Sequence, residues 1–406
     1  MLNSTDAVRR RDLRLLVTGS SLRAIANGLL GVIAGIYLAR LGLEASELGL
    51  VLGAGVAGTA LSAFGVTFWG DRFGRKRGLF WLALISAGGG IVVAATSQVV
   101  VLAVAAFLGT MNSLGKDRAG AGALEQAILP NTVNEENRTR AFAWFNVAAD
   151  IGNGVGSAIA AMPLLLREVW GLDELNSLRS AMLLYAALLA LSSLCYARFS
   201  PAVERQGRHE KIKISPRSRG ILTKLSLLFA LDSFAGGFLG TALFAYFFYA
   251  QFGVSEAVIA ALFVGARIMN ALSHLGAAWL AKRIGLVRTM VFTHTPSSFL
   301  LMTIPFTDHF WVAALLFLIR EGLAEMDVPT RQSYLMAVVR PEERTFAAGI
   351  TNLSRMTARA FAPVLAGGAM QFAALWTPLV AAALMKISYD MLLFAAFRKV
   401  KPPEER

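Results

Sequence analysis

The sequence predicts an all-α membrane protein with twelve transmembrane helices in two pseudo-symmetric six-helix bundles. Its 406 residues are 56% hydrophobic and only 16% charged, and its mean hydropathy is +0.57. A soluble domain carries roughly a quarter charged residues, so this chain has too few to cover a surface that faces water. Long apolar runs recur along the chain, and one pattern of polar residues occurs twice at a fixed spacing.

Six apolar runs precede the middle of the chain, and each has the roughly 20 residues that a spanning helix needs. The first follows a basic start and has no small-residue cleavage site, so we interpret it as a span and not as a signal peptide. The six predicted spans cover residues 14–39, 46–68, 79–97, 99–132, 139–164 and 179–198.

A basic segment at 199–220 interrupts the apolar pattern, contains Pro201 and Pro216, and has no run that could span a membrane. We predict that it is a cytoplasmic linker between an N-terminal bundle, residues 1–198, and a C-terminal bundle, residues 221–406. Six further spans then follow, at 221–251, 256–281, 286–305, 310–338, 343–371 and 375–397.

The placement of lysine and arginine predicts the orientation. With the N-terminus inside, the outer loops carry only Arg40, Arg167 and Arg179, while the other basic residues outside the spans lie on the inner side. This asymmetry follows the positive-inside rule. It predicts a multi-pass cell-membrane protein, in a bacterial inner membrane, with both termini in the cytoplasm. The net charge of +13 then reflects topology, and no nucleic-acid partner is expected.

The two halves of the chain repeat each other. A set of five residues, which runs from the end of the fourth predicted span into the start of the fifth, recurs 206 positions later: Gln126, Glu136, Arg138, Thr139 and Ala141 match Gln332, Glu342, Arg344, Thr345 and Ala347. A weaker repeat follows the second span of each half, where Arg72, Gly74 and Arg77 match Arg283, Gly285 and Arg288. Duplicated six-helix halves are typical of secondary transporters, which bind substrate near mid-membrane between the halves.

The sequence lacks the motifs that are typical of enzymes and of ATP-driven transporters. The one cysteine, Cys195, excludes a disulfide framework, and the four histidines have no metal-ligand spacing. Gly115 and Lys116 are not a phosphate-binding loop, because Thr110 stands at its first glycine position and Asp117 at its Ser/Thr position. We therefore expect no enzyme activity, no cofactor and no bound metal.

The segment after the second span carries a recognisable motif: Gly70, Asp71, Arg72, Phe73, Gly74, Arg75, Lys76 and Arg77. It resembles the loop between helices two and three of the major facilitator superfamily. The Asp-Arg-x-Gly-Arg-Lys core is complete, whereas Thr67 stands at the position of an upstream glycine. Helix count, the six-plus-six split and the basic central loop extend the resemblance over the whole chain. It implies a monomeric transporter that works by alternating access.

The resemblance also implies a cytoplasmic gate. Gly74 permits a tight turn, and Asp71 can face the positive N-terminus of helix eleven, which begins near Arg344. The gating residues predicted on this basis are Gly70, Asp71, Arg72, Gly74, Arg75 and Arg344. A second predicted gating group lies at the bundle interface of the family fold: Asp150, Arg267, Arg355 and Arg359, with Asp150 paired to Arg267. The alternative for the motif arginines is that they only mark the inner face.

Charged residues inside predicted spans are costly, at least roughly 2.5–3.5 kcal/mol each. They concentrate on helices one, four, seven and ten, which line the central cavity of the family fold. Guanidinium groups match carboxylate or phosphate, so we predict substrate binding by Arg23, Lys116, Arg118 and Arg320, together with Asn270. Partly desolvated carboxyls can exchange protons near neutral pH, so the predicted proton-coupling residues are Asp117, Asp232, Glu321, Glu325 and Asp327.

Two alternatives to these roles stay open at this point. The buried charges could form a self-satisfied network that touches no substrate. Lys386 and Asp390, four residues apart on helix twelve, are interpreted as a local pair at the periphery.

The sequence thus predicts a proton-coupled secondary transporter of a small polar solute, anionic or zwitterionic. A glycine–proline pattern in helix eleven (Ala362, Pro363, Gly367 and Gly368) resembles an antiporter motif and slightly favours export. The expected partners are the substrate, a proton or other coupling ion, and the lipid bilayer. The alternatives are a multidrug/proton antiporter, a divalent metal exporter, and a membrane enzyme or scaffold.

Overall fold

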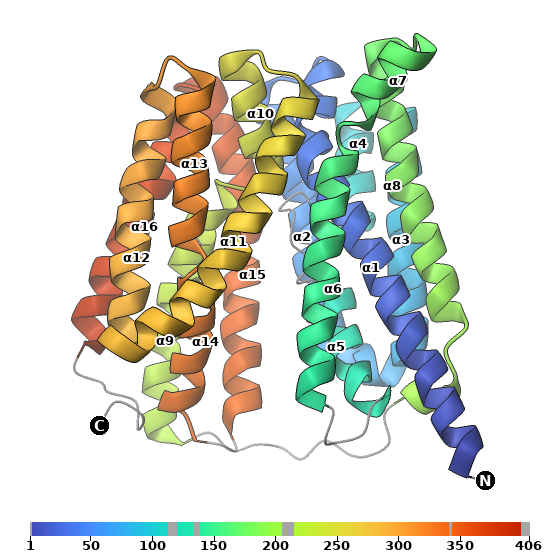
Figure 1. Cartoon of the computed structure of the whole chain (residues 1–406), viewed down its shortest axis with the longest axis vertical. Coiled ribbons are helices and arrows are strands. Elements are labelled where there is room, and N and C mark those ends of the chain that lie inside the picture. Colours follow the sequence, from blue (N-terminus) through green and yellow to red (C-terminus); the bar gives the residue numbers. More distant parts are fainter. Residues whose placement is uncertain (1, 113–119, 133–137, 205–214, 341–342, 399–406) are drawn as a thin grey trace. The chain divides into compact units, whose positions relative to one another are not determined.

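The computed structural model describes residues 2–112, 120–132, 138–204, 215–340 and 343–398, and every regular element within them is helical (Figure 1). The helices follow the twelve predicted spans in order. Eight spans are single helices: α1 (Leu2–Arg40), α2 (Ala45–Phe73), α3 (Arg75–Ala95), α8 (Glu174–Ala197), α11 (Glu256–Ile284), α12 (Leu286–Thr303), α15 (Arg344–Phe372) and α16 (Thr377–Phe397).

Four predicted spans are each built from two helices. They are α4 (Val99–Leu108) with α5 (Gly120–Thr132), α6 (Arg138–Ile159) with α7 (Met162–Trp170), α9 (Pro216–Gly237) with α10 (Thr241–Phe252), and α13 (Phe310–Ala324) with α14 (Asp327–Val338). Two short 3-10 turns, η2 (Pro201–Val203) and η3 (Ile304–Phe306), follow α8 and α12.

The helices carry the apolar outer surface of a membrane protein. Eight helical stretches of the described chain are long and apolar enough to cross a bilayer. Large hydrophobic side chains such as Trp81, Leu183 and Leu384 are exposed on them. Exposed apolar faces of this extent are rare on soluble monomers, so these faces are suited to lipid.

Contacts divide the chain into two compact units. The first contains residues 1–208 and 240–263, and the second contains residues 209–239 and 264–406. Residues 240–263, which form α10 and the start of α11, therefore pack in the first unit. The division predicted from the sequence, with a linker at 199–220, remains a prediction.

In the first unit α1 is the central helix, in contact with α6, α8 and α10, while α3 packs on α8 and α2 on α4 and α5 (Figure 1). Glycines allow α1 and α6 to touch through their backbones. A Cβ atom at Gly28 would lie 2.2 Å from the Asn153 carbonyl oxygen, and one at Gly156 would lie 2.0 Å from that of Ile25. Small residues at such crossings let membrane helices approach closely.

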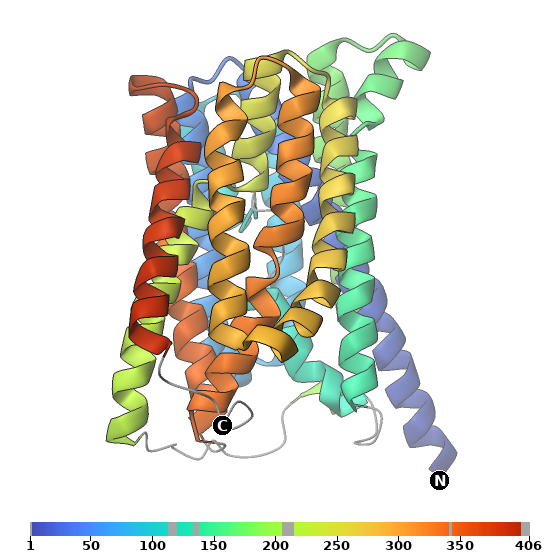
Figure 2. The same ribbon diagram turned by 60° about the vertical axis from the view of Figure 1, so that its left-hand side comes forward.

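In the second unit α9 packs against α15 and α16, and α12 packs against α13, α14 and α16 (Figure 2). Its buried core includes Phe229, Met290, Tyr334 and Leu393. Pro296 lies inside α12 and Pro363 inside α15. The charged residues described below lie among these helices.

The predicted repeat is confirmed at the level of backbone geometry. Gly74 and Gly285 both precede a helix, α3 and α12 respectively, and both have positive φ values of 92° and 87°. Positive φ costs an L-residue with a Cβ roughly 1–2 kcal/mol, which explains glycine at both positions. Helix α15 begins at Arg344, which is a matched residue of the stronger repeat.

Candidate functional site

A buried ion pair joins the first and fourth spans of the first unit. On α1, Arg23 donates from Nε to Glu125 Oε1 of α5 over 3.3 Å, and its second terminal nitrogen bonds Glu125 Oε2. The hydroxyl of Tyr196 on α8 donates to the same carboxylate. Arg23 is 7% exposed and Glu125 1%. The charge of Arg23 is thus balanced inside its own unit, and its predicted contact with substrate remains a prediction.

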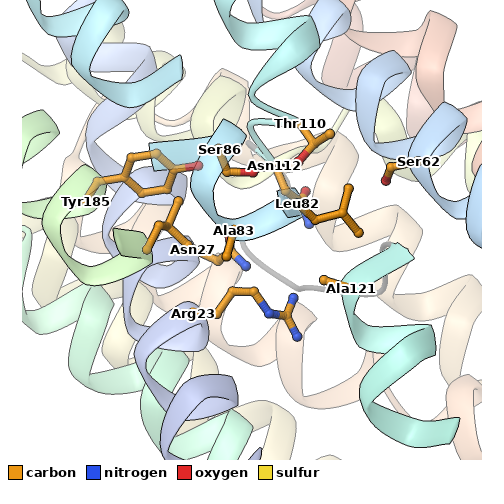
Figure 3. Close-up of a pocket in the computed structure, with 11 residues that line it drawn as sticks. Arg23, Asn27, Ser62, Leu82, Ala83, Ser86, Thr110, Asn112, Ala121 and Tyr185 are labelled. Atoms are coloured by element: carbon orange, nitrogen blue, oxygen red, sulfur yellow. Dashed lines mark hydrogen bonds between the residues drawn. The ribbon is translucent and has the colours of Figure 1, made fainter. Parts of the chain in front are cut away.

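A small polar cavity lies beside this pair (Figure 3). Its lining includes Asn27 on α1, Ser86 on α3, and Thr110 and Asn112 after α4. The Ser86 and Thr110 hydroxyls lie 3.0 Å apart, and Thr110 has a φ of 47°. The cavity volume of about 30 Å³ is room for roughly two water molecules. The interior of this unit is therefore polar next to Arg23.

The second unit contains a larger buried charge network centred on Asp232 of α9. Lys386 of α16 donates to Asp232 Oδ1 over 2.9 Å, and Arg331 of α14 donates to Asp232 Oδ2 over 2.9 Å. All three residues are at least nine-tenths buried. One carboxylate is therefore shared by two cations from two other helices.

The network continues along α14 and towards α9. Arg331 Nη1 also lies 2.9 Å from Asp327 Oδ2, one turn earlier on its own helix. Its guanidinium carbon lies 5.4 Å from the centroid of the Phe229 ring, which is a cation–π contact. Two of the predicted proton-coupling residues, Asp232 and Asp327, are thus brought together by one arginine.

On its other side the network reaches α12. His294 Nε2 lies 3.1 Å from Lys386 Nζ, and His294 Nδ1 lies 3.0 Å from Asp390 Oδ1. Asp390 Oδ2 also accepts from the Thr295 hydroxyl over 3.0 Å. Asp390 is fully buried, and His294 is 2% exposed. The interpretation of Lys386 and Asp390 as a local peripheral pair is therefore wrong, because each bonds other helices in the interior.

Sequence reasoning missed the partners that organise both sites. The spacing of the histidines excludes a metal site, but it does not reveal a histidine that bonds Lys386 and Asp390 on another helix. A signal for the pairs was present in the repeat: Glu125 and Arg331 are 206 positions apart, next to the matched Gln126 and Gln332. In each unit the first span is thus paired with the fourth, but with opposite polarity.

The remaining charged candidates of the tenth span lie on α13 and at its end. Arg320 and Glu321 bond each other, and Glu325 is the C-cap residue that follows α13. Asn270 is buried on α11. Lys116, Asp117 and Arg118 lie outside the described residues. The predicted substrate and proton roles of these residues remain predictions.

The motif loop is held inside the first unit by a residue that the sequence did not single out. The backbone N–H groups of Arg75 and Lys76 donate to Glu204 over 2.7 and 3.2 Å, so this carboxylate caps the N-terminus of α3. The Arg75 side chain donates to the Ala127 carbonyl over 2.8 Å. Gly74 thus makes the predicted turn. The side chains of Asp71, Arg72 and Arg344, and the surroundings of Gly70, lie outside the described part.

The second gating group is distributed over three helices. Asp150 is exposed on α6 and Arg267 is half-buried on α11. Arg355 on α15 donates to the Ser233 hydroxyl over 2.8 Å, and Arg359 lies one turn further, near Gly236. The gating roles, and the pairing of Asp150 with Arg267, remain predictions.

Comparison with known proteins identifies the family. The sequence profile described as Major Facilitator Superfamily matches residues 16–363 and 225–406. The chain belongs to the major facilitator superfamily. An uncharacterized membrane protein of Saccharomyces cerevisiae is 22% identical over 421 residues, which cover 95% of this chain and 94% of the yeast protein.

Solved structures of superfamily transporters share the fold. A bacterial homolog of the human lysosomal transporter Spinster, in an inward-facing and occupied conformation, matches with a TM-score of 0.75 at 15% identity, covering 96% of this chain and 97% of that one. The nucleoside transporter NupG matches with a TM-score of 0.74 at 12% identity, covering 96% and 99%. The chain is accordingly a multi-pass membrane protein of a transporter superfamily.

Proposed function

We propose that this protein is a proton-coupled secondary transporter of a small polar solute that carries a carboxylate or another anionic group. The observation that carries the proposal is the position of Asp232, buried between Lys386 and Arg331. A proton on Asp232 would neutralise the carboxylate that these two cations share. The cations would then lack a counter-charge, which is costly in a buried site.

An anionic group on the substrate can supply that counter-charge. Arginine offers a planar fork that suits a carboxylate, and Lys386 adds a point charge. Protonation of Asp232 and binding of an anion therefore favour each other. Two ligands coupled in this way shift the same conformational equilibrium, as alternating access requires.

Because protonation of Asp232 and anion binding favour each other, the proposal bears on the direction of transport. Solute and proton travel together, so an inward proton gradient drives uptake, whereas export remains the alternative favoured by the glycine–proline pattern of α15. A multidrug or metal antiporter has the opposite sign, because proton and substrate then compete for one carboxylate.

The test is proton flux in liposomes that contain the purified full chain and a trapped pH indicator. Organic anions, zwitterions, amphiphilic amines and divalent metals are added in turn without an imposed gradient. We expect one class of anion or zwitterion to acidify the lumen, and Asp232→Asn to abolish the effect. Asp308→Asn, at an exposed position before α13, is the matched control and retains it.

Two results would overturn the proposal. Luminal alkalinisation driven only by amines or metals would show antiport of a cation. An anion response that persists unchanged in Asp232→Asn would show that this carboxylate is not the coupling group.

A further inference from the structure

His294 lies in an arrangement that fixes its tautomer. Its Nδ1 faces the Asp390 carboxylate at 3.0 Å, and a carboxylate only accepts hydrogen bonds, so Nδ1 carries the hydrogen. Thr295 anchors the other Asp390 oxygen. The Nε2 lone pair of a neutral ring then accepts from Lys386 Nζ at 3.1 Å. Asp390 thereby orients the imidazole towards the ammonium group.

A second proton on the ring changes this contact from attraction to repulsion. Imidazolium presents N–H donors on both nitrogens, and the ammonium of Lys386 has only donors as well. Two cationic donors cannot share a 3.1 Å contact in the interior of the protein. His294 Nε2 also lies 3.8 Å from Asp232 Oδ1, so the protonated ring is close enough to replace Lys386 beside that carboxylate.

We propose that His294 is a proton-binding group that exchanges with Lys386 as the partner of Asp232, and that Asp390 is the positioning residue that sets its tautomer. The inference rests on the proposed function in that it adds a second proton-binding group to the same coupling network. In the exchange, the proton binds Nε2, the Lys386–Asp232 contact breaks, and the ammonium is released to pair with an incoming anion.

Charged and titratable groups from every helix packed on α12 bear on this exchange. Helix α16 contributes Lys386, Asp390 and Tyr389, whose ring stands edge-on to the imidazole at 6.0 Å. Arg331 and Asp327 of α14 act through Asp232, which α9 supplies. On α13, Arg320 and Glu321 bond each other. Asp232 and Asp390 together provide the negative charge that a protonated ring needs.

The test is nitrogen NMR of the full chain in lipid nanodiscs, with ¹⁵N-labelled histidine. Single His→Gln variants assign His294 among the four histidines of the chain. We expect a neutral ring with hydrogen on Nδ1 at high pH and a doubly protonated ring at low pH. In Lys386→Met the doubly protonated ring should appear at higher pH than in wild type, because the ammonium group that Nε2 faces has been removed.

Two further variants make the result specific. Lys282→Met removes an exposed lysine of α11 and should leave the conversion unchanged. Asp390→Asn should release the tautomer, so that the neutral ring places hydrogen on Nε2 in part of the population. Resonances of His294 that stay neutral from pH 5 to 8.5, or a conversion unaffected by Lys386→Met, would overturn the inference.

The outcomes separate this inference from the proposed function. If the ring responds as expected but no solute moves protons in liposomes, the exchange stands and the transport assignment fails. If anion-driven proton flux depends on Asp232 while His294 never titrates, the transport assignment stands and the exchange is wrong.

Discussion

Lys386 and Asp232 form a buried ion pair across α16 and α9, with the ammonium nitrogen 2.9 Å from the carboxylate oxygen. Arg331 shares the same carboxylate but is also paired with Asp327. Loss of one member therefore affects the two cations unequally, and this gives the first prediction.

Asp232→Asn should destabilise the protein by about 3–5 kcal/mol, the usual cost of leaving a buried charge unpaired. In the double variant Asp232→Asn with Lys386→Met, the loss should be smaller than the sum of the single effects, because Arg331 retains Asp327. Thermal and denaturant unfolding in detergent measure all three variants. Additive losses would show that the pair is not energetically coupled.

The buried Arg23–Glu125 pair of the first unit predicts that two substitutions around it lower the stability by different amounts. Glu125→Gln leaves Arg23 buried without its counter-charge and should cost about 3–5 kcal/mol. Tyr196→Phe removes only one hydrogen bond to the carboxylate and should cost about 1–3 kcal/mol. Unfolding measurements on both variants provide the comparison, and equal losses would contradict the assigned roles.

The close approach of α1 and α6 predicts opposite effects for two neighbouring glycines. Gly156→Ala would place a Cβ 2.0 Å from the Ile25 carbonyl oxygen, whereas a Cβ at Gly154 meets nothing within 4 Å. Gly156→Ala should destabilise by about 1–3 kcal/mol through overpacking. Gly154→Ala should be neutral, or stabilising by about 0.5–1 kcal/mol because alanine favours helix. Melting temperatures of the two variants decide the matter.

Two ion pairs of the first unit differ in their exposure to solvent, so we expect their loss to lower the stability by different amounts. Glu256, which begins this helix, bonds Arg167 of α7, and their side chains are 5% and 21% exposed. The Arg40–Glu174 pair is 42% and 39% exposed. Glu256→Gln should therefore cost about 1–3 kcal/mol, and Glu174→Gln less than about 1 kcal/mol. Hydrogen exchange should increase at α10 and the start of α11 only in Glu256→Gln.

Asp173, which caps the N-terminus of α8, should make the stability of the protein depend on pH. Hydrogen bonds from the backbone and side chain of Asn176 lower the pKa of Asp173 below its ordinary value. A lowered pKa means that ionised Asp173 stabilises the fold above its unfolded pKa and that this contribution is lost as pH falls through the folded pKa. Asparagine can also cap a helix and does not titrate, but its neutral oxygen accepts weaker hydrogen bonds than an ionised carboxylate does. Wild type should thus be more stable than Asp173→Asn near neutral pH, and the difference should vanish in acid.

Much of the architecture could be predicted because the bilayer imposes it. Apolar length fixed the spans, and the repeat marked equivalent places in the two halves. Breaks within spans were harder to foresee. The seventh span breaks after Gly236 and Gly237, where a Cβ at Gly237 would lie 2.5 Å from that of Ala362. That break depends on packing against α15, which local sequence does not reveal.

The sequence predicted which helices carry the charged residues of the candidate site, but not which side chains pair with one another. Asp232 and Asp327 were chosen because charges in spans are rare. The sequence did not indicate that Arg331 is their shared partner, or that His294 and Asp390 belong to the same network. The reason is physical: a buried charge is stabilised by whichever helix packs beside it, and contacts such as Lys386 to His294 join residues 92 positions apart.

In the two buried pairs the positions of cation and carboxylate on the first and fourth spans are exchanged, and this limits how the halves of the protein could be recombined. Arg23 with Glu125 in one unit and Asp232 with Arg331 in the other occupy corresponding first and fourth spans. In a protein assembled from two copies of the first half, the described first and fourth spans of both halves would carry the Arg23–Glu125 arrangement, in place of a carboxylate bonded by a lysine and an arginine. The two halves are therefore not interchangeable at this pair of positions.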